Sequence, residues 1–384
     1  MVFFSLVFIV NVSIGTVRGY EAVSGIITSG TTWIKAKSPY NLTENVAIDE
    51  GVTLIIEPGV TVNLNSYYIR VNGTLTARGS NTDKIYFNGG SLEFTPSSTG
   101  WNEQTGTGSK IENAVINATL QLGNTSPMIN KNTIMKSIYV GGGSPIISKN
   151  TIAIVTPSDW LGRPSYLSIA IGIGNENTAL IIDNTISGYL DNTAISVTGG
   201  SPTIQRNKIS NSYGYGGDLG YWQSGISISG NSSPIIKQNT VTKNAVGISL
   251  EGSPTPTIND NNIEENSNYN LRMKPGMQVD INVANNWWGT TDTTTIEEKI
   301  YDYHDDFNLG EATYTPILTE PNPQAIPDPN APIPVLTPTP SPSTSPTPSQ
   351  EPQQTQIETI VGVAITAAVL GAGLGFLIYL IKRK

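Results

Sequence analysis

One nine-residue phrase recurs along the middle of the chain and constrains the fold more than any other feature. SPMINKNTI (126–134), SPIISKNTI (144–152), SPTIQRNKI (201–209), SPIIKQNTV (233–241) and TPTINDNNI (255–263) share one pattern, and ALIIDNTI (179–186) is a weaker copy. Recurrence on this scale indicates a solenoid, in which a single repeat buries its apolar side only against its neighbours.

The spacing and the apolar pattern of the phrase predict strands. The repeats lack the i, i+3, i+4 apolar stripe of a helical repeat, and their Ile and Val residues alternate or form short β-branched runs. A further strand with an I-x-I pattern follows each phrase. We therefore predict an all-β chain that forms a single right-handed parallel β-helix with three strands per coil.

The Asn of the phrase has a predicted structural role. It recurs at steps of 18, 34, 23, 32, 22 and 25 residues, at Asn132, Asn150, Asn184, Asn207, Asn239, Asn261 and, by extension of the pattern, Asn286. We expect each Asn at a corner between strands, in left-handed backbone geometry, which Asn tolerates. Stacked side-chain amides then form a ladder along the coils. Ligand binding by this row is the alternative.

Composition excludes several classes of function. The chain has no cysteine, so disulfides, thiolate metal sites and cysteine nucleophiles are absent, and His304 is the only histidine. A net charge of −9 argues against a general nucleic-acid partner, because phosphate binding depends on basic patches.

Both ends of the chain have the pattern of targeting segments. Residues 1–19 have the apolar run of a secretory signal peptide, with an uncleaved anchor as the alternative. Residues 357–381 include an uncharged run from 360 to 381 that is long enough for a transmembrane helix, and the basic residues 382–384 favour the cytoplasmic side. We expect a single-pass protein at the cell surface, with an extracellular ectodomain at residues 20–318 and a Pro/Ser/Thr-rich stalk at residues 319–356.

A secreted ectodomain makes N-glycosylation sequons relevant. Five occur within residues 20–318, and we predict glycosylation at Asn41, Asn72, Asn117, Asn124 and Asn231.

The repeated phrase, the opening VTLIIEPGVTV…VNGTLTARG and the closing NNWWGT…IYDYHDDF…YTPIL together resemble a known family. They look like the right-handed parallel β-helix repeat proteins of the pectate-lyase-like superfamily, in particular archaeal and bacterial cell-surface members. Similar repeats occur in carbohydrate-binding and sugar-hydrolase proteins and in periplasmic copper-accessory proteins. The resemblance covers roughly residues 25–318. It implies the fold and leaves the function open, because lyases, hydrolases and adhesins share this fold.

Loop lengths give the one functional signal in the sequence. From the second Ile of each phrase to the following strand, the steps 152→171, 186→195 and 209→226 span 19, 9 and 17 residues, and the other loops are shorter. Insertions on one face of a solenoid commonly form its binding face. These loops contain seven aromatic residues that we predict bind carbohydrate: Trp160, Tyr166, Tyr189, Tyr213, Tyr215, Tyr221 and Trp222. In the alternative, the same side chains pack the loops onto the stack.

Catalysis and metal binding are the weaker hypotheses. Asp159, Asp191 and Asp218, one in each loop, are weak candidates for a glycosidase pair, but the sequence shows no recognisable catalytic motif of the superfamily's enzymes. We predict no cofactor, because a calcium ion shared by these acids has no supporting loop motif. Asp302, His304, Asp305 and Asp306 lie in the terminal segment, where we expect a capping role. A copper site would need several His, Met or Cys ligands.

These observations together favour a surface-anchored protein that binds glycans or other envelope components. A purely structural or adhesive role is the first alternative, and a polysaccharide hydrolase or lyase is the second.

Overall fold

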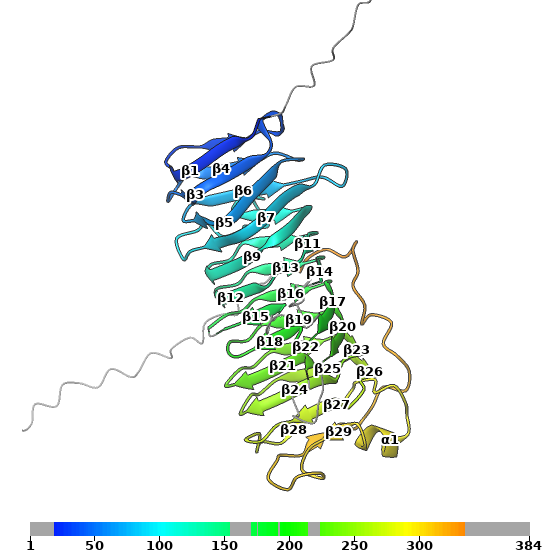
Figure 1. The fold of residues 1–384 in the computed structure, drawn as a ribbon. Coiled ribbons are helices and arrows are strands. Elements are labelled where there is room, and N and C mark those ends of the chain that lie inside the picture. The colour runs from blue at the N-terminus through cyan, green and yellow to red at the C-terminus, as the bar shows by residue number, and fades with distance from the viewer. Residues whose placement is uncertain (1–18, 154–169, 175, 191–192, 214–222, 335–384) are drawn as a thin grey trace, which may run out of the picture. The chain divides into compact units, whose positions relative to one another are not determined.

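Parallel strands stacked along one axis make up nearly all of the regular structure (Figure 1). The structure, a computed structural model, describes residues 19–153, 170–174, 176–190, 193–213 and 223–334. Within these ranges the helical elements are the 3-10 turn η1 (Lys35–Lys37) and α1 (Thr293–Glu297). The predicted all-β, parallel architecture is confirmed.

One side of the solenoid is a ten-stranded sheet in which each strand pairs in parallel with the next. Its strands, in order, are β2 (Thr31–Trp33), β4 (Thr53–Ile56), β6 (Thr74–Arg78), β8 (Lys110–Glu112), β10 (Met128–Asn130), β13 (Ile146–Ser148), β16 (Leu180–Ile182), β19 (Thr203–Gln205), β22 (Ile235–Lys237) and β25 (Thr257–Asn259).

The remainder of the wall is an 18-stranded sheet that begins with five strands and then divides. The five are β1 (Glu21–Ile27), β3 (Tyr40–Ile48), β5 (Thr61–Val71), β7 (Ile85–Phe94) and β9 (Ala114–Asn124). One column continues as β11 (Thr133–Ile134), β14 (Thr151–Ile152), β17 (Thr185–Leu190), β20 (Lys208–Tyr213), β23 (Thr240–Thr242) and β26 (Asn262–Glu264). The other continues as β12 (Ile138–Gly142), β15 (Ile171–Ile173), β18 (Ile195–Val197), β21 (Ser224–Gly230), β24 (Val246–Gly252), β27 (Tyr269–Met273) and β29 (Ile300–Tyr301). A separate pair, β28 (Ile281–Asn282) and β30 (Ala312–Thr313), lies near the C-terminal end.

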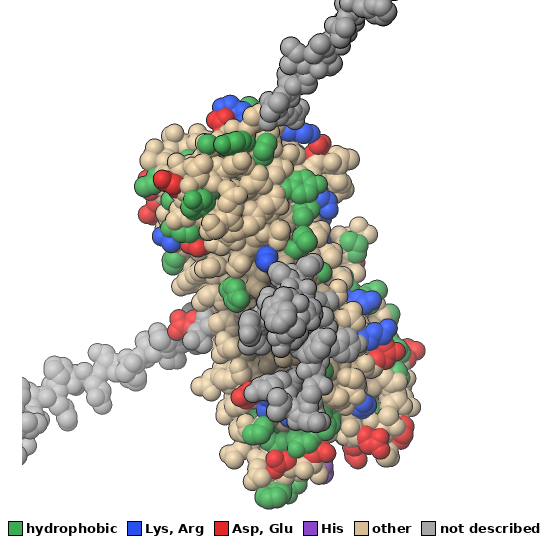
Figure 2. Space-filling view, viewed as in Figure 1, with side chains coloured by type: hydrophobic (Ala, Val, Ile, Leu, Met, Phe, Trp, Pro, Cys, Tyr) green, Lys and Arg blue, Asp and Glu red, His purple; other side chains and the backbone are tan. Residues whose placement is uncertain are grey.

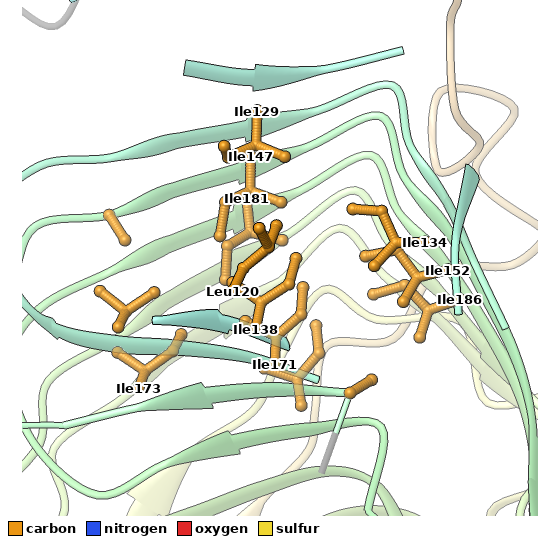
Figure 3. Close-up of a cluster of buried hydrophobic side chains, with 14 of the residues drawn as sticks. Leu120, Ile129, Ile134, Ile138, Ile147, Ile152, Ile171, Ile173, Ile181 and Ile186 are labelled. Carbon is orange, nitrogen blue, oxygen red and sulfur yellow. The ribbon is translucent and has the colours of Figure 1, made fainter. Parts of the chain in front are cut away.

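The core consists of columns of aliphatic side chains that run along the axis. Alternation along each strand points every second residue inward, and the parallel register places like residues directly above one another. Figure 3 shows three such columns facing a common interior, all fully buried: Ile129, Ile147 and Ile181; Ile134, Ile152 and Ile186; and Leu120, Ile138 and Ile171.

The left-handed residue at the repeated corner is not the Asn, and our expectation on this point was wrong. The residue before each Asn of the phrase has the positive φ, between 50° and 59°: Lys131, Lys149, Asp183, Arg206, Gln238, Asp260 and Asn285. The chain turns at that residue, and the turn directs the following Asn into the interior, where all seven are buried. Four of these seven left-handed positions hold a long polar residue, Lys, Arg or Gln, whose side chain points away from the core.

The segment at residues 321–333, called the strap below, returns along the outside of this corner (orange in Figure 1). Asn322 donates its backbone N–H to Asn262 Oδ1 over 2.7 Å, and its carbonyl accepts from Asn262 Nδ2 over 3.0 Å. Thr240 Oγ1 donates to the Ala325 carbonyl. The Asp328 N–H donates to Asp183 Oδ1 over 3.0 Å.

The strap reaches as far as Lys149, whose Nζ donates to the Ala331 carbonyl over 2.6 Å. Ala325, within the strap, is fully buried. The compact unit extends to Ile333. The division into an ectodomain at residues 20–318 and a stalk from residue 319 stays a prediction. The prolines prevent sheet pairing in this segment. The residues between them still form hydrogen bonds with the corner, through the carbonyls of Asn322, Ala325 and Ala331.

The predicted signal peptide, except for Gly19, and the predicted transmembrane helix lie outside the described residues. Among the residues that the structure describes, no helix has the length and hydropathy needed to span a membrane.

Candidate functional site

The three long loops start and end on consecutive coils. They connect β14 to β15, β17 to β18 and β20 to β21. The strands that lead into the loops are paired in register through Ile152, Ile186 and Ile209. The strands that follow the loops are likewise paired in register, through Ile171, Ile195 and Ile226. All three insertions are thus attached along one edge of the solenoid.

Backbone hydrogen bonds fix the returning ends of the loops to one another. The Ile138 N–H donates to the Ala170 carbonyl over 2.8 Å, the Ile171 N–H to the Ala194 carbonyl over 3.0 Å, and the Ala194 N–H to the Ser224 carbonyl over 3.2 Å. Ala170, Ala194 and Ser224 are buried. The loops therefore rejoin the stack at a rigid, regularly spaced seam.

Of the seven predicted carbohydrate-binding aromatics, two lie in the described backbone. Tyr189 is paired with Ser212, and Leu190 with Tyr213, so the two tyrosines occupy neighbouring strands at the loop edge. The other five aromatics and the three acids fall outside the described residues: Trp160, Tyr166, Tyr215, Tyr221, Trp222, Asp159, Asp191 and Asp218.

A row of outward-facing residues, small apart from Tyr139 and called the floor below, lies next to the loop edge. Sequence analysis did not identify it. The outward residues of β12, β15, β18 and β21 are in register: Tyr139, Gly172, Ser196 and Ser227. Tyr139 is 44% exposed, and the other three are partly exposed. Only the pairing register brings these residues together, because the loops vary the spacing between them along the chain.

Most of the described surface in the view of Figure 2 is neither charged nor hydrophobic. A surface of hydroxyl, amide and backbone groups suits neutral hydroxylated ligands better than phosphates or lipids, because it offers hydrogen bonds without fixed charge.

The seven repeated asparagines form one continuous hydrogen-bonded row. In each of the six steps, the backbone N–H and Nδ2 of one Asn both donate to Oδ1 of the next, over 2.9–3.1 Å. None of the seven is more than 2% exposed. Each Nδ2 also donates to a backbone carbonyl of the coil before, as Asn207 does to Ile181. With their amides used in this way, these side chains have nothing left to offer a ligand.

A second, shorter Asn row marks the corner from which the long loops leave. The N–H and Nδ2 of Asn244 donate to Asn266 Oδ1 over 3.0 and 3.1 Å, and Asn266 Nδ2 donates to Asn270 Oδ1 over 2.9 Å. One coil earlier the row ends at Ser212, whose N–H donates to Asn244 Oδ1 over 3.0 Å. The left-handed turn is still present there, at Asn211 with φ 65°, so the third loop is inserted after an otherwise regular corner.

The five sequons differ in exposure. Asn124 and Asn231 are exposed, whereas Asn41, Asn72 and Asn117 are partly buried. Asn41 Oδ1 accepts from Asn63 Nδ2 over 2.7 Å, and Asn72 Oδ1 accepts from Thr95 Oγ1 over 3.0 Å. Glycosylation stays a prediction at all five positions.

The acidic cluster near the C-terminus is organised around a turn. Asp302 is 4% exposed, and its carboxylate accepts from the N–H groups of His304 and Ala312 over 3.0 and 2.9 Å. The imidazole of His304 is largely exposed and lies 3.8 Å from Glu311. Within the described residues, no group of three or more acidic or histidine side chains has the geometry to hold a metal ion.

Comparisons with known proteins support the fold. Residues 118–289 match the family model for the right handed beta helix region. Neither the curated proteins nor the solved structures gave a match to the chain.

Proposed function

We propose that this chain, which carries a right-handed β-helix region at residues 118–289, is a surface-anchored protein that binds carbohydrate along its loop edge. The attachment of three consecutive insertions along a single edge carries this proposal, because the strands on either side of the insertions are in register. The proposal takes the aromatic and acidic residues of the insertions to share that face. Insertions placed in this way commonly form the binding face of a solenoid.

The floor beside the loops suits an extended polymer. Successive parallel strands lie ~4.8 Å apart, so a chain that follows the solenoid axis meets a new coil about once per sugar ring. Ser196 and Ser227 supply hydroxyl groups, and Gly172 leaves room above the backbone. The ring of Tyr139 offers an apolar face at one end. Aromatic rings from the loops would complete the walls of the groove.

Sequence features support the cellular placement in this proposal. The proposal takes residues 1–19 as a signal peptide and residues 357–381 as the membrane anchor. It also takes each coil to be built from three strands. The Pro/Ser/Thr-rich residues that follow the compact unit would hold that unit away from the membrane.

The test uses the soluble unit, residues 20–333, against a panel of neutral and acidic polysaccharides. Retention and the release of new reducing ends are both measured. Trp160→Ala, Trp222→Ala and Tyr139→Ala should each weaken retention by about tenfold, or ~1.4 kcal/mol. Tyr86→Ala is the matched control, because Tyr86 is 42% exposed on β7, in line with the column that starts at β11 and away from Tyr139 on β12.

Each outcome separates the proposal from its alternatives. Equal loss in the Tyr86 variant would move binding away from the loop edge. Release of reducing ends that disappears in Asp191→Ala would make the protein a hydrolase or lyase. Failure to retain any polymer would favour the structural or adhesive role.

A further inference from the structure

Three polar side chains meet on the outer face of the ten-stranded sheet, away from the loop edge. Lys110 and Glu112 alternate along β8 and therefore share a face, and Glu112 is directly opposite Asn130 on β10. Lys110 is 7% exposed, Asn130 is 4% exposed, and the side chain of Glu112 is 14% exposed. A lysine and an amide are rarely buried at outward-facing positions, because each loses its hydration.

The carboxylate of Glu112 contacts both neighbours at once. Its Oε2 is 3.1 Å from Lys110 Nζ, and its Oε1 accepts from Asn130 Nδ2 over 2.8 Å. The ring of Trp101 lies over the amine, with Nζ 4.6 Å from its centroid. One acid therefore touches both an amine and an amide nitrogen, in a place that is shielded from water.

The amide of Asn130 is also held from its other side. Its Oδ1 accepts a hydrogen bond from Ser148 Oγ over 3.0 Å, and Ser148 is itself buried. A donor on the carbonyl oxygen stabilises negative charge as it develops there during attack on the carbonyl carbon. The Asn130 amide thus contacts a carboxylate and a hydroxyl donor, and the Lys110 amine is held by the same carboxylate.

We propose that Lys110 and Asn130 join in an isopeptide bond, with Glu112 as the proton carrier. A proton moves from the Lys110 ammonium to Glu112, and the neutral Nζ attacks Cγ of Asn130. Glu112 then protonates the amide nitrogen, the Cγ–Nδ2 bond breaks and ammonia leaves, and Nζ gives its second proton back to Glu112. The Nζ–Cγ amide remains, and no oxidant or cofactor is consumed.

The electrostatics of the cluster suit a slow reaction that occurs once per molecule. Burial alone would raise the pKa of Glu112, but the charge of Lys110 and the hydrogen bonds from Lys110 and Asn130 outweigh it, so the pKa is lowered. The resting state is therefore the ion pair. The neutral pair that reacts is therefore the minor form, and the charge of Arg78, whose Nε is 3.4 Å from Glu112 Oε2, also favours the ionised carboxylate, so the reaction is slow.

The bond would link two consecutive coils covalently in a chain that has no cysteine. It would close a loop between residues 110 and 130 and stabilise the stack chiefly by restricting the unfolded chain, as a disulfide does.

Peptide mapping of the purified full chain, made in a host without N-glycosylation, tests the proposal. Trypsin does not cut at an acylated lysine, so residues 85–131 should appear as one peptide that is lighter than its sequence mass by one ammonia. Further cleavage after Glu112 should leave two chains that remain joined. Succinimide formation also releases ammonia, but it leaves no joined chains.

Variants assign the roles. Glu112→Gln should give separate, unmodified 85–110 and 111–131 peptides. Lys110→Met removes the tryptic site, so its 85–131 peptide should have its full sequence mass and should fall into separate pieces on cleavage after Glu112. Circular dichroism should show that both variants keep the fold. Asn130→Asp should still give the joined peptide, now lighter than its sequence mass by one water in place of one ammonia. Quantitative recovery of unmodified 85–110 and 111–131 peptides from folded wild-type protein would overturn the proposal, and that readout does not depend on any variant folding.

Discussion

The Asn row predicts a large loss of stability from one small substitution, Asn207→Ala. The Oδ1 of Asn207 accepts from the N–H and Nδ2 of Asn184, both over 2.9 Å. Its Nδ2 donates to the carbonyls of Ile181 and Gln205 and to Asn239 Oδ1, over 2.9–3.0 Å. Alanine removes all five bonds from a site with no exposed surface.

The magnitude follows from the fate of each partner. The backbone N–H of Asn184 is left without an acceptor in the interior, which costs about 1–3 kcal/mol. The Nδ2 of Asn184 keeps its bond to the Ile147 carbonyl, and Asn239 Oδ1 keeps the N–H of residue 207. These partners therefore lose only the net value of a hydrogen bond, about 0.5–1.5 kcal/mol each. We expect a total loss of about 2–6 kcal/mol in the free energy of unfolding.

Urea unfolding measures this loss, and hydrogen exchange at the Asn184 amide locates it. Lys208→Ala is the matched control, because Lys208 is the next residue and is exposed, so its substitution should change stability by no more than about 0.5 kcal/mol. If Asn207→Ala is as mild as Lys208→Ala, the row does not stabilise the stack as argued.

Asn207→Asp separates the acceptor role of the side chain from its donor role. An ionised carboxyl group keeps an oxygen for Asn184 and has no donor, whereas the protonated form keeps one O–H donor. Burial raises the folded-state pKa of such a group above its unfolded value of about 3.9. The additional penalty is therefore absent below about pH 3.9 and grows as the pH rises from there to the folded-state pKa. Urea midpoints for this variant that do not fall between about pH 4 and pH 8, relative to wild type, would contradict this reasoning.

Three further predictions concern the corner and the surface. Ala325→Arg should displace the strap, because Ala325 is the strap's fully buried residue, and amide exchange along the corner should then rise about tenfold or more. Ile326→Arg, at the 55% exposed neighbour, should not reproduce this effect. Lys131→Gly should stabilise the protein by up to about 1 kcal/mol in thermal or urea unfolding, since glycine removes the strain of φ 56° at an exposed position, and a destabilised variant would contradict this. In a glycosylating host, peptide mapping should find the exposed Asn124 and Asn231 more fully occupied than the partly buried sequons, and equal occupancy at all five would refute the role of exposure.

The repeated phrase was sufficient to predict the stack, because inward positions on parallel strands must be apolar on every coil. It also predicted which Asn residues repeat. It did not predict which corner residue turns the chain, because the left-handed position holds Lys, Asp, Arg, Gln or Asn and has no single residue type. The left-handed backbone conformation repeats at this corner position, whereas the residue type does not.

Two features could not be read from local sequence at all. The floor at Tyr139, Gly172 and Ser196 depends on register across loops of unequal length. The strap has the composition of a linker, and the hydrogen bonds that hold it connect residues up to 182 positions apart. Pairings at such separations leave no periodic signal in the sequence.

The strap also decides where tension enters the molecule. The chain completes its last strand, β30, near the C-terminal end, but it leaves the compact unit only after passing Lys149, about halfway along the stack (Figure 1). A pull on the tail at residue 334 therefore acts on the flank of the solenoid and loads the strap contacts together, in shear. Without the strap, the same pull would peel off the terminal coil, and a stack held by nearest-neighbour contacts would then unzip one coil at a time.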